Sequence, residues 1–586
     1  MSGVKFSRDH IVSDRSNLSS GLTSASRGDI GWLASAIIAG CSLFAVLWTI
    51  SRMDRGFDFT DEAFYLMWAQ DPARFKLAYG LFGYGLHPLF ELVGESVADL
   101  RRLAALIAAA LGALASLTML DSLRVPLRSP ATLQILSSSA LLPFSYYAFW
   151  IPTPSYNWFA LISGLFLVCA MVDLLRPEHL TRSAFFAGLS AASIMFSRPQ
   201  NAFAYGGIYL ASALFFAYDV KRLSQLLLAA ALWTVALLTM VAWWMPLNTI
   251  VAQVQSYFAI FGASHPVHTN VLVSLTNFFQ TSGSLFLCSG LIFLVTSVLH
   301  RYERLIPWLA ILQVCASGVI TLDVVFNLTA SNFVYRIGPI TGAIAYMVLS
   351  ICRLRPDADQ RFITLMGWAS LVPLVATFGS VDRISEQLIF SCGIWGIIST
   401  VASCNALHRF WCTGIAGAWV VLTFVAVQIG LAAPYRLASP VDMQLNPTPV
   451  GSRSTLKLDE KTNKFVTDLR ESAKASGFCD GDSVLDLGSA SPGVIFAIGG
   501  RAPTFPWIFA GYPFSERFGE QIIAQTDQQV LARTWLVVSE SPRTFTAAQI
   551  QVIGIDLSSY KRVVRLNHPV TGYPVSLFAP PQLHPC

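Results

Sequence analysis

Three carboxylates stand within five residues of one another, directly after the first long apolar stretch, as Asp58, Asp61 and Glu62. Charged side chains at the point where a chain leaves lipid are energetically unfavourable, so their presence there suggests a function. If the segment is helical, these acids and Tyr65 share one face, because they are spaced by three, four and seven residues. Such carboxylates can act as a general base or help to hold a divalent cation. The alternative is a solvated turn that only ends a membrane helix.

Aromatic residues are interleaved with these acids, at Phe57, Phe59, Phe64 and Trp68. This pattern suits a helix in the membrane interface that turns its acids to water and its rings to lipid. We therefore expect a short interfacial helix after the first span.

The elements that position these residues are predicted to be membrane helices. Only 12% of the 586 residues are charged, and the mean hydropathy is +0.55. This composition indicates a polytopic membrane protein. The net charge of +5 does not point to nucleic acid, because the basic residues lie in short loops. Thirteen apolar stretches are expected to span: 30–50, 103–120, 131–150, 158–175, 183–197, 203–218, 223–245, 271–299, 305–326, 333–351, 362–378, 388–406 and 411–433.

Basic residues mark one side of the predicted bundle. If the N-terminus is cytoplasmic, the positive-inside rule holds at nearly every loop. Arg101 and Arg102 run against it, beside the first outer loop. An odd number of spans then places everything after residue 433 outside. The inner loops carry Arg124, Arg128, Arg176, Arg182, Lys221, Arg222, Arg301, Arg304, Arg353, Arg355, Arg361 and Arg409.

The two ends of the chain differ from the apolar part. Residues 1–29 are polar and Ser-rich, which predicts a disordered cytoplasmic tail. Residues 434–586 combine a helical stretch at 460–475 with short β-like stretches separated by Gly, Pro and Asp. The β-like stretches are 483–487, 494–498, 535–539, 562–566 and 574–578. The predicted fold is an α-helical polytopic membrane domain, 30–433, followed by a small extracytoplasmic α/β domain, 434–586.

Most of the ten cysteines lie inside the apolar stretches, where they are expected to act as small apolar residues. No metal-type C-x-x-C spacing occurs. Cys479 and Cys586 lie in the polar tail and could pair if that tail faces an oxidising compartment.

This architecture resembles that of the GT-C glycosyltransferases, membrane enzymes that take a sugar from a polyprenyl-phosphate carrier. It is most similar to the bacterial members grouped with protein mannosyltransferases and lipid A aminoarabinose transferases. Residues 60–65 match their DE-x-x-Y element. Residues 84–90, with His87, resemble their K/H-P-P-L-Y element with one proline missing.

Two more segments carry the resemblance. Phe-Ser-Arg-Pro at 196–199 stands where the family often has a basic residue at the outer end of a span. Residues 335–339 resemble the R-Y-x-x-P element, with Tyr335 and Arg336 in reversed order.

The resemblance implies roles for these residues. Asp61 is the expected general base for the acceptor hydroxyl, and Glu62 or Asp58 would orient it or help to hold a divalent cation. Arg198 and Arg336 would hold the carrier phosphate. The alternative for both arginines is an interfacial anchor whose side chain reaches to the membrane surface. The depth of Arg336, four residues inside its span, favours a position facing a cavity.

Two other loops hold weaker candidates. Tyr156 and Asn157 end a proline-rich turn and could contact sugar hydroxyls, although turn chemistry explains them equally well. His265 and His268 could ligate a metal on a helix, but Pro266 between them favours a solvated loop.

The predicted function is transfer of a hexosyl or pentosyl group from a polyprenyl-phosphate donor to a hydroxyl acceptor, with inversion. The acceptor would be a cell-envelope glycan, lipid or protein at the outer face of the cell membrane. A transporter or flippase of lipid-linked saccharides is the rival, although few polar residues lie midway along the spans. A methyltransferase is a further alternative, because residues 484–493 resemble a strand and glycine loop. A structural turn is the favoured interpretation of that loop.

Overall fold

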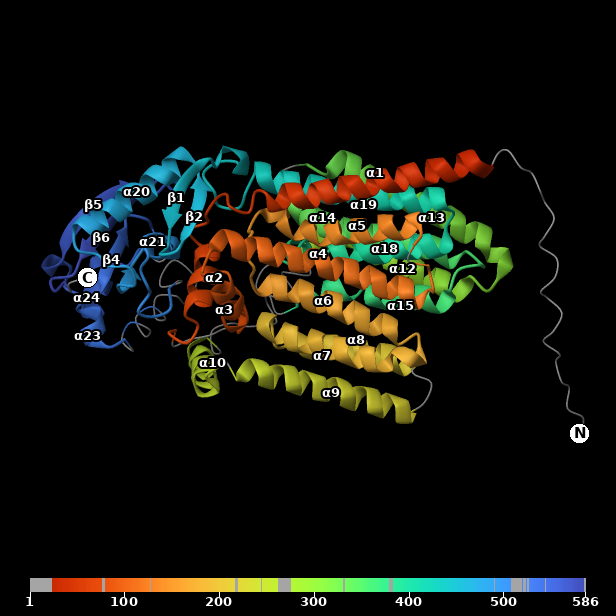
Figure 1. The fold of residues 1–586 in the computed structure, drawn as a ribbon, viewed down its shortest axis with the longest axis horizontal. Coiled ribbons are helices and arrows are strands. Elements are labelled where there is room, and N and C mark those ends of the chain that lie inside the picture. Colours follow the sequence, from red (N-terminus) through yellow and green to blue (C-terminus); the bar gives the residue numbers. More distant parts are fainter. Residues whose placement is uncertain are drawn as a thin grey trace, which may run out of the picture.

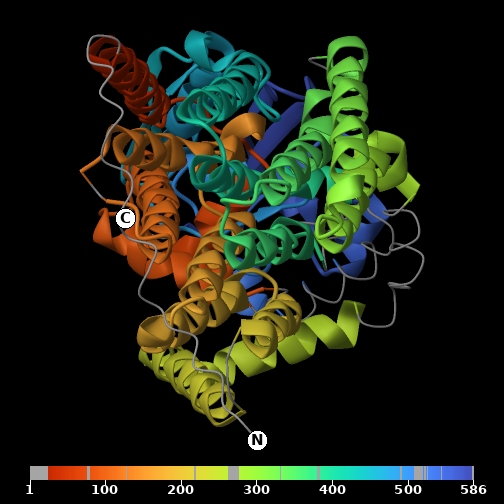
Figure 2. The same ribbon diagram turned by 90° about the vertical axis from the view of Figure 1, so that its right-hand side faces the viewer.

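Long helices run side by side along the longest axis of the molecule, and a smaller α/β unit covers one end of them (Figure 1). Viewed along that axis, most helices are seen nearly end-on (Figure 2). The computed structural model describes residues 24–583 except for 76–79, 127, 217–219, 244, 262–275, 330–331, 379–382, 489–490, 507–518, 520–522, 524–525 and 543.

Each predicted apolar stretch falls on one helix or on two successive helical elements. The elements are α1 (Ser24–Ile50), α4 (Val97–Ser122), α5 (Pro130–Leu141), η1 (Leu142–Phe149), α6 (Tyr156–Asp173), α7 (Leu180–Ser197), α8 (Asn201–Phe216), α9 (Val220–Ala242), η3 (Phe279–Gly283), α12 (Ser284–Leu299), α13 (Ile306–Asn327), α14 (Phe333–Arg353), α15 (Gln360–Ala369), α16 (Val372–Ala376), α17 (Ile384–Leu388), α18 (Gly393–Ala406) and α19 (Arg409–Ala432). The first helix starts at Ser24, six residues before the predicted start of the first span.

Seven of the described helices are long and apolar enough to cross a membrane, and α8 and α12 are shorter apolar helices. The thirteen predicted stretches therefore correspond to helical segments. Fewer of the described helices, however, are long enough to span a membrane. In the apolar parts of α9 and α13, only 6% and 17% of the residues are buried inside the protein. Water would penalise so large an apolar surface, whereas lipid does not. The helical part is accordingly a membrane domain.

Several of the loops predicted to be basic and cytoplasmic gather at the end of the bundle remote from the α/β unit. The Arg182 guanidinium lies 2.7 Å from both Asp121 and Asp173, which joins the ends of α4, α6 and α7. Arg355 donates to the Ala406 carbonyl at the end of α18 over 3.4 Å.

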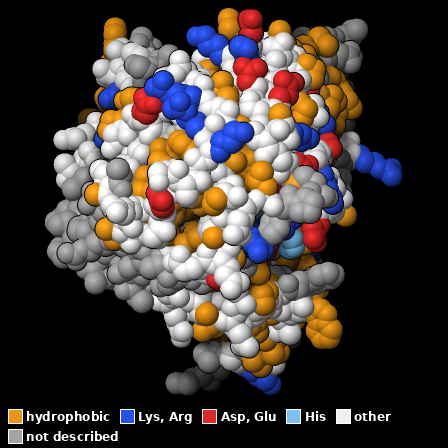
Figure 3. Space-filling view, turned by 90° about the vertical axis from the view of Figure 1, so that its left-hand side faces the viewer, with side chains coloured by type: hydrophobic (Ala, Val, Ile, Leu, Met, Phe, Trp, Pro, Cys, Tyr) orange, Lys and Arg blue, Asp and Glu red, His pale blue; other side chains and the backbone are white. Residues whose placement is uncertain are grey.

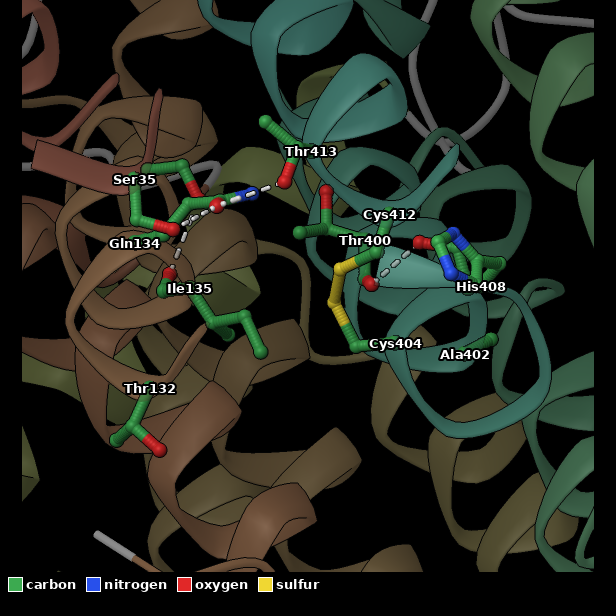
Figure 4. The surroundings of a disulfide bond; sticks show 12 residues. Ser35, Thr132, Gln134, Ile135, Thr400, Ala402, Cys404, His408, Cys412 and Thr413 are labelled. Carbon is green, nitrogen blue, oxygen red and sulfur yellow. Dashed lines mark hydrogen bonds between the residues drawn. A yellow bond between two sulfur atoms is a disulfide. The ribbon is translucent and has the colours of Figure 1, made fainter. Parts of the chain in front are cut away.

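A disulfide at this same end joins Cys404 of α18 to Cys412 of α19 (Figure 4). Treating these two cysteines only as small apolar residues was therefore wrong. Nearby, the Gln134 side-chain oxygen accepts from Ser35 over 2.9 Å and from Thr413 over 3.3 Å. Disulfides persist mainly in oxidising compartments, whereas the basic loops predict that this end faces the cytoplasm. The orientation of the protein in the membrane thus stays a prediction.

The C-terminal unit contains a hairpin and a four-stranded sheet. The hairpin pairs β1 (Asn446–Val450) with β2 (Ser454–Leu458). The sheet has the order β3-β4-β6-β5, with β3 parallel to β4 and the other pairs antiparallel. Its elements are β3 (Val484–Asp486), β4 (Trp535–Ser539), β5 (Lys561–Asn567) and β6 (Pro574–Ala579), with α20 (Glu460–Ala475), α21 (Pro492–Ala497), α23 (Gln528–Leu531) and α24 (Ala547–Val552).

The local patterns predicted most of this unit. The helix at 460–475 and four of the five β-like stretches are confirmed. The stretch 494–498 was wrong, because Pro492 occupies the first helical turn and starts α21 there. The hairpin was missed, since Pro447 and Pro449 argue against a strand. Cys586 lies outside the described residues, so its pairing with Cys479 stays a prediction.

Candidate active site

The acidic segment lies at the end of the bundle that the C-terminal unit covers, where α2 (Asp61–Gln70) and α3 (Phe82–Leu92) cross it (Figure 1). Helix α2 begins at Asp61, so Asp58 precedes the helix instead of sharing its face. The Asp58 carboxylate accepts the backbone N–H of Glu62 over 3.2 Å, and the Glu62 carboxylate accepts that of Asp58 over 3.1 Å. This reciprocal bonding satisfies N–H groups that the start of a helix leaves unpaired.

Asp58 is almost completely buried, at 3% exposure. Thr60 donates to it through its N–H over 3.0 Å and through its hydroxyl over 2.7 Å. Burial, together with the charge of Asp61, raises the pKa of Asp58 to about 7. Asp58 therefore builds the start of α2.

Glu62 forms a buried ion pair with Arg101 of α4. Their side chains are 2% and 0% exposed, and the Arg101 guanidinium donates to one Glu62 oxygen over 2.7 and 3.0 Å. The Thr153 hydroxyl, in the proline-rich turn, donates to the same oxygen. Arg101 also donates to the carbonyls of Met53 over 2.9 Å and Gly56 over 3.0 Å. Glu62 thus fastens α2 to α4 and to the preceding loop.

This pair explains why Arg101 departs from the positive-inside pattern. The positive-inside pattern marks Arg101 as an exception but does not connect it with the nearby acids. A buried pair of this kind fixes the relative position of α2 and α4, because either charge without its partner would be strongly unfavourable at this depth.

Asp61 is more accessible than the two acids beside it, with 19% of its side chain exposed. It lies 3.1 Å from the guanidinium of Arg436, and it also hydrogen-bonds to the Tyr435 hydroxyl. Burial and the charge of Asp61 hold the pKa of Tyr435 well above its usual range. Both partners come from the segment that joins α19 to the C-terminal unit. No local pattern in the sequence points to these two partners, since Arg436 is 375 residues away from Asp61.

Four of the predicted residues form one connected group next to Asp61. The rings of Tyr65 and Tyr156 are 6.0 Å apart and perpendicular. The Arg198 guanidinium lies 5.0 Å from the centre of the Tyr156 ring and donates to the Asn157 side-chain oxygen over 2.9 Å. Because Tyr65 is one helical turn after Asp61, this group links the accessible acid to a buried cation.

Arg198 is only 7% exposed, yet its described partners are neutral. Besides Asn157, it donates to the Ala376 carbonyl and to the Gln387 side chain, each over 2.7 Å. Within the part of the chain that the structure describes, no carboxylate lies within ion-pair distance of it. A buried cation held by neutral acceptors is stabilised when an anion joins it. Arg198 is thus suited to bind a phosphate, and Gln387 is a contact that the sequence did not reveal.

Arg336 differs from Arg198, because it already has a carboxylate partner. It lies 3.3 Å from Asp323 of α13. Both side chains line a groove of about 370 Å³ between α12, α13 and α14, together with Gln280 and Asn327. Tyr335, the neighbouring residue, lies with its ring centre 5.8 Å from the Arg383 guanidinium.

The histidines do not join the acidic segment among the described residues. His87 lies 2.7 Å from the Ala69 carbonyl and 3.4 Å from Glu91. Ala69 is eight residues along α2 from Asp61, which corresponds to about 12 Å of helix. His265 and His268 lie outside the described residues.

A divalent cation would need more free ligands than this arrangement offers. Both oxygens of Glu62 accept hydrogen bonds, and both oxygens of Asp58 do so too. No group of three or more His, Cys, Asp or Glu side chains in the described ranges could hold a metal ion. The residues present therefore do not fit the expected cation, and no step of the chemistry below is assigned to one.

The C-terminal unit covers the acidic segment directly. Gly56 donates to the Lys457 carbonyl over 2.9 Å, and Gly493 donates to the Phe59 carbonyl over 2.8 Å. Phe57 and Phe59 are 1% exposed, with Phe57 stacked on Phe496 and Phe59 against Phe465. The expectation that these rings face lipid was wrong, because the C-terminal unit buries them.

The glycine loop after β3 takes part in this contact. Asp486 accepts the N–H groups of Gly488 and Ser491, each over 2.8 Å. A side chain at Gly493 would collide with the backbone of Phe59, and one at Gly488 would lie 2.8 Å from Ser539. Packing thus accounts for both glycines, which favours the structural turn over a methyltransferase loop.

Comparison with known proteins yields one structural likeness. No family model matches the chain, and no curated protein matches it. Among solved structures, the chain is similar to the crystal structure of ArnT from Cupriavidus metallidurans in the apo state, at 12% identity and a TM-score of 0.38. The alignment covers 95% of this chain and 98% of that one. At that identity and TM-score, the likeness does not by itself assign the chain to a family.

Proposed function

We propose that this protein is a GT-C type glycosyltransferase that moves a sugar from a polyprenyl-phosphate donor to a hydroxyl acceptor. One observation carries the proposal. An accessible carboxylate, Asp61, is linked through Tyr65 and Tyr156 to Arg198, a buried cation held by neutral acceptors. Transfer from a lipid phosphate requires these two groups, a base for the acceptor and a positive charge for the departing phosphate.

The proposed step is a direct displacement. Asp61 takes the proton from the acceptor hydroxyl, and the resulting oxygen forms a bond to the anomeric carbon. The bond between that carbon and the phosphate oxygen breaks at the same time, and the electron pair leaves with the polyprenyl phosphate. Because the acceptor enters opposite to the leaving group, the anomeric configuration is inverted.

The remaining residues position these two groups. Glu62 and Arg101 fix the start of α2, and Asp58 caps it. Asn157 and Gln387 orient the Arg198 guanidinium toward its ligand. Tyr65 and Tyr156 offer ring faces and hydroxyls to the sugar. We assign Arg336 and Tyr335 to the lipid part of the donor, since apolar side chains such as Val319, Leu322 and Phe326 make up half of the lining of the groove beside Arg336. His87 serves to hold α3 against α2.

We propose that the reaction takes place at the outer face of the cell membrane, with a cell-envelope glycan, lipid or protein as acceptor. The basic loops at the opposite end of the bundle support that orientation. A reporter fused after Ala433 should be active only outside the cytoplasm. Reporter activity in the cytoplasm would place the site on the inner face and contradict this part of the proposal.

The function itself is tested with purified protein in liposomes and a panel of radiolabelled polyprenyl-phosphate sugars. We expect label from one donor to become covalently attached to a membrane or glycan acceptor, and the Asp61→Asn variant to lose this transfer. A transporter would instead move intact donor across the bilayer without forming a new glycosidic bond. That outcome, with no covalent product from any donor, would refute the proposal.

A further inference from the structure

We propose that Arg436 is a second phosphate-binding residue, which holds the Asp61 carboxylate in the empty site and exchanges it for the donor phosphate. This inference rests on the proposed function and adds a coupling to it. The arrival of the donor would free Asp61, so that the base becomes available only when there is a sugar to transfer.

The contacts of Arg436 place it at the centre of the acidic segment. One guanidinium nitrogen lies 3.1 Å from the Asp61 carboxylate and 2.8 Å from the Thr60 hydroxyl. That hydroxyl donates in turn to Asp58 over 2.7 Å. Arg436 therefore contacts the predicted base directly and its neighbouring acid through one hydroxyl.

The backbone around Arg436 is built to direct this side chain. Arg436 has φ of +50°, in the left-handed region that residues with a side chain rarely adopt. On one side, Tyr435 donates its N–H to the Phe149 carbonyl over 3.0 Å. On the other side, Leu437 packs where Gly56 lacks a side chain, since a Cβ at that glycine would collide with it. Both neighbours are fixed, and the turn between them points the guanidinium at Asp61.

The ion pair between Arg436 and Asp61 can exchange one partner for a phosphate because it is only partly buried. The Arg436 side chain is 38% exposed, whereas that of Arg101 in the neighbouring pair is fully buried. A part-exposed pair is weak and can open, while a buried pair cannot open without a large cost. The Arg436 guanidinium also lies 4.6 Å from the centre of the Tyr435 ring.

Phosphate is the ligand that fits this chemistry. Arginine binds phosphate oxygens through two parallel hydrogen bonds, a geometry that a phosphate group offers to Arg436 as a strong alternative to its 3.1 Å contact with Asp61. A carboxylate that shares its charge with a guanidinium also accepts a proton poorly. Opening of the pair is therefore needed before Asp61 can act as the base.

The test measures binding of a short polyprenyl monophosphate to purified full-length protein, with no transfer involved. Arg436→Gln should weaken binding about tenfold or more, the scale of a lost charged hydrogen bond. Asp61→Asn should strengthen binding about two- to fivefold, because the competing carboxylate is gone. The double variant should bind as weakly as Arg436→Gln alone. Arg55→Gln is the matched control, since Arg55 pairs with Asp442 over 3.2 Å in the same region and should leave affinity unchanged.

The outcomes separate this inference from the proposed function. Unchanged affinity in Arg436→Gln, or weaker binding in Asp61→Asn, would overturn the exchange while leaving the glycosyltransferase proposal intact. If the unmodified protein does not bind polyprenyl phosphate, the proposed function fails and the exchange fails with it. Inorganic phosphate serves as a second probe, and it should show the same ranking of variants because the guanidinium binds the headgroup rather than the lipid.

Discussion

Asp61 and Glu62 are neighbours in the chain, yet the structure gives them opposite surroundings. Glu62 is buried and paired with the fully buried Arg101, while Asp61 is part-exposed and paired with the part-exposed Arg436. The partner of Glu62 belongs to a membrane helix, and the partner of Asp61 belongs to the segment leading to the C-terminal unit. The comparison shows that an acidic motif can combine one buried residue that stabilises the structure with one accessible residue that is available for catalysis.

The buried pair can be broken, and this should give the largest effect on stability. We expect Glu62→Gln to lower the free energy of unfolding by about 3–5 kcal/mol, because it leaves Arg101 charged and unpaired in the interior. Unfolding by denaturant in detergent measures this. Glu91→Gln is the control, since its side chain is 63% exposed and should change stability by less than about 0.5 kcal/mol.

A second variant keeps the prediction about the buried pair testable if Glu62→Gln does not accumulate. Replacing both partners, as Glu62→Leu with Arg101→Met, should restore much of the stability, because it removes both buried charges. If Glu62→Gln were as stable as the unmodified protein, the pair between Glu62 and Arg101 would not stabilise the fold.

A similar contrast separates the two arginines that were predicted to hold phosphate. Arg198 has neutral partners among the described residues, whereas Arg336 is paired with Asp323. Arg198→Gln should therefore weaken donor binding by about 1.5–3 kcal/mol, and Arg336→Gln by less. Binding of the donor identified in the panel measures both. The reverse ranking would place the phosphate at the groove beside Arg336.

The third acid, Asp58, should make stability depend on pH. Its pKa in the folded protein is raised to about 7 by burial, whereas in the unfolded chain it is about 4. The folded state is therefore favoured while Asp58 is protonated, and this contribution is lost as the pH rises from about 4 through 7. Asp58→Asn should flatten that part of a plot of unfolding temperature against pH. An unchanged plot would mean that Asp58 ionises without a penalty.

Surface ion pairs around the covered end should have the smallest effect. Figure 3 looks onto this end of the molecule, where acidic and basic side chains lie intermixed. Lys457 lies 2.8 Å from Asp54, with side chains 41% and 18% exposed. Lys457→Met should cost about 0.2–1 kcal/mol, and salt should reduce the difference from the unmodified protein. A loss as large as that of Glu62→Gln would show that docking of the C-terminal unit depends on this pair.

The features that could be predicted from the sequence are those determined by residues close together in the chain. Apolar runs predicted the helical segments, alternation predicted four strands, and spacing predicted that Asp61 and Tyr65 share a helix face. The sequence could not predict partners brought together by packing, such as Gln387, which contacts Arg198 across 189 residues. It also could not show that Asp61 is part-exposed while Glu62 is buried, because burial depends on α4 and on the C-terminal unit rather than on neighbouring residues.

The most direct test of the account is the turnover of Asp61→Asn, measured beside its donor affinity. Asparagine keeps the size of aspartate but cannot take the acceptor's proton, so turnover should fall about 10²–10⁴-fold. Asp54→Asn is the matched control, because Asp54 is equally exposed, at 18%, and is also paired with a basic residue. We predict that Asp54→Asn keeps nearly full turnover and that Asp61→Asn keeps its fold and binds donor at least as tightly as the unmodified protein. A folded Asp61→Asn variant that binds donor and transfers sugar at the normal rate would contradict the account.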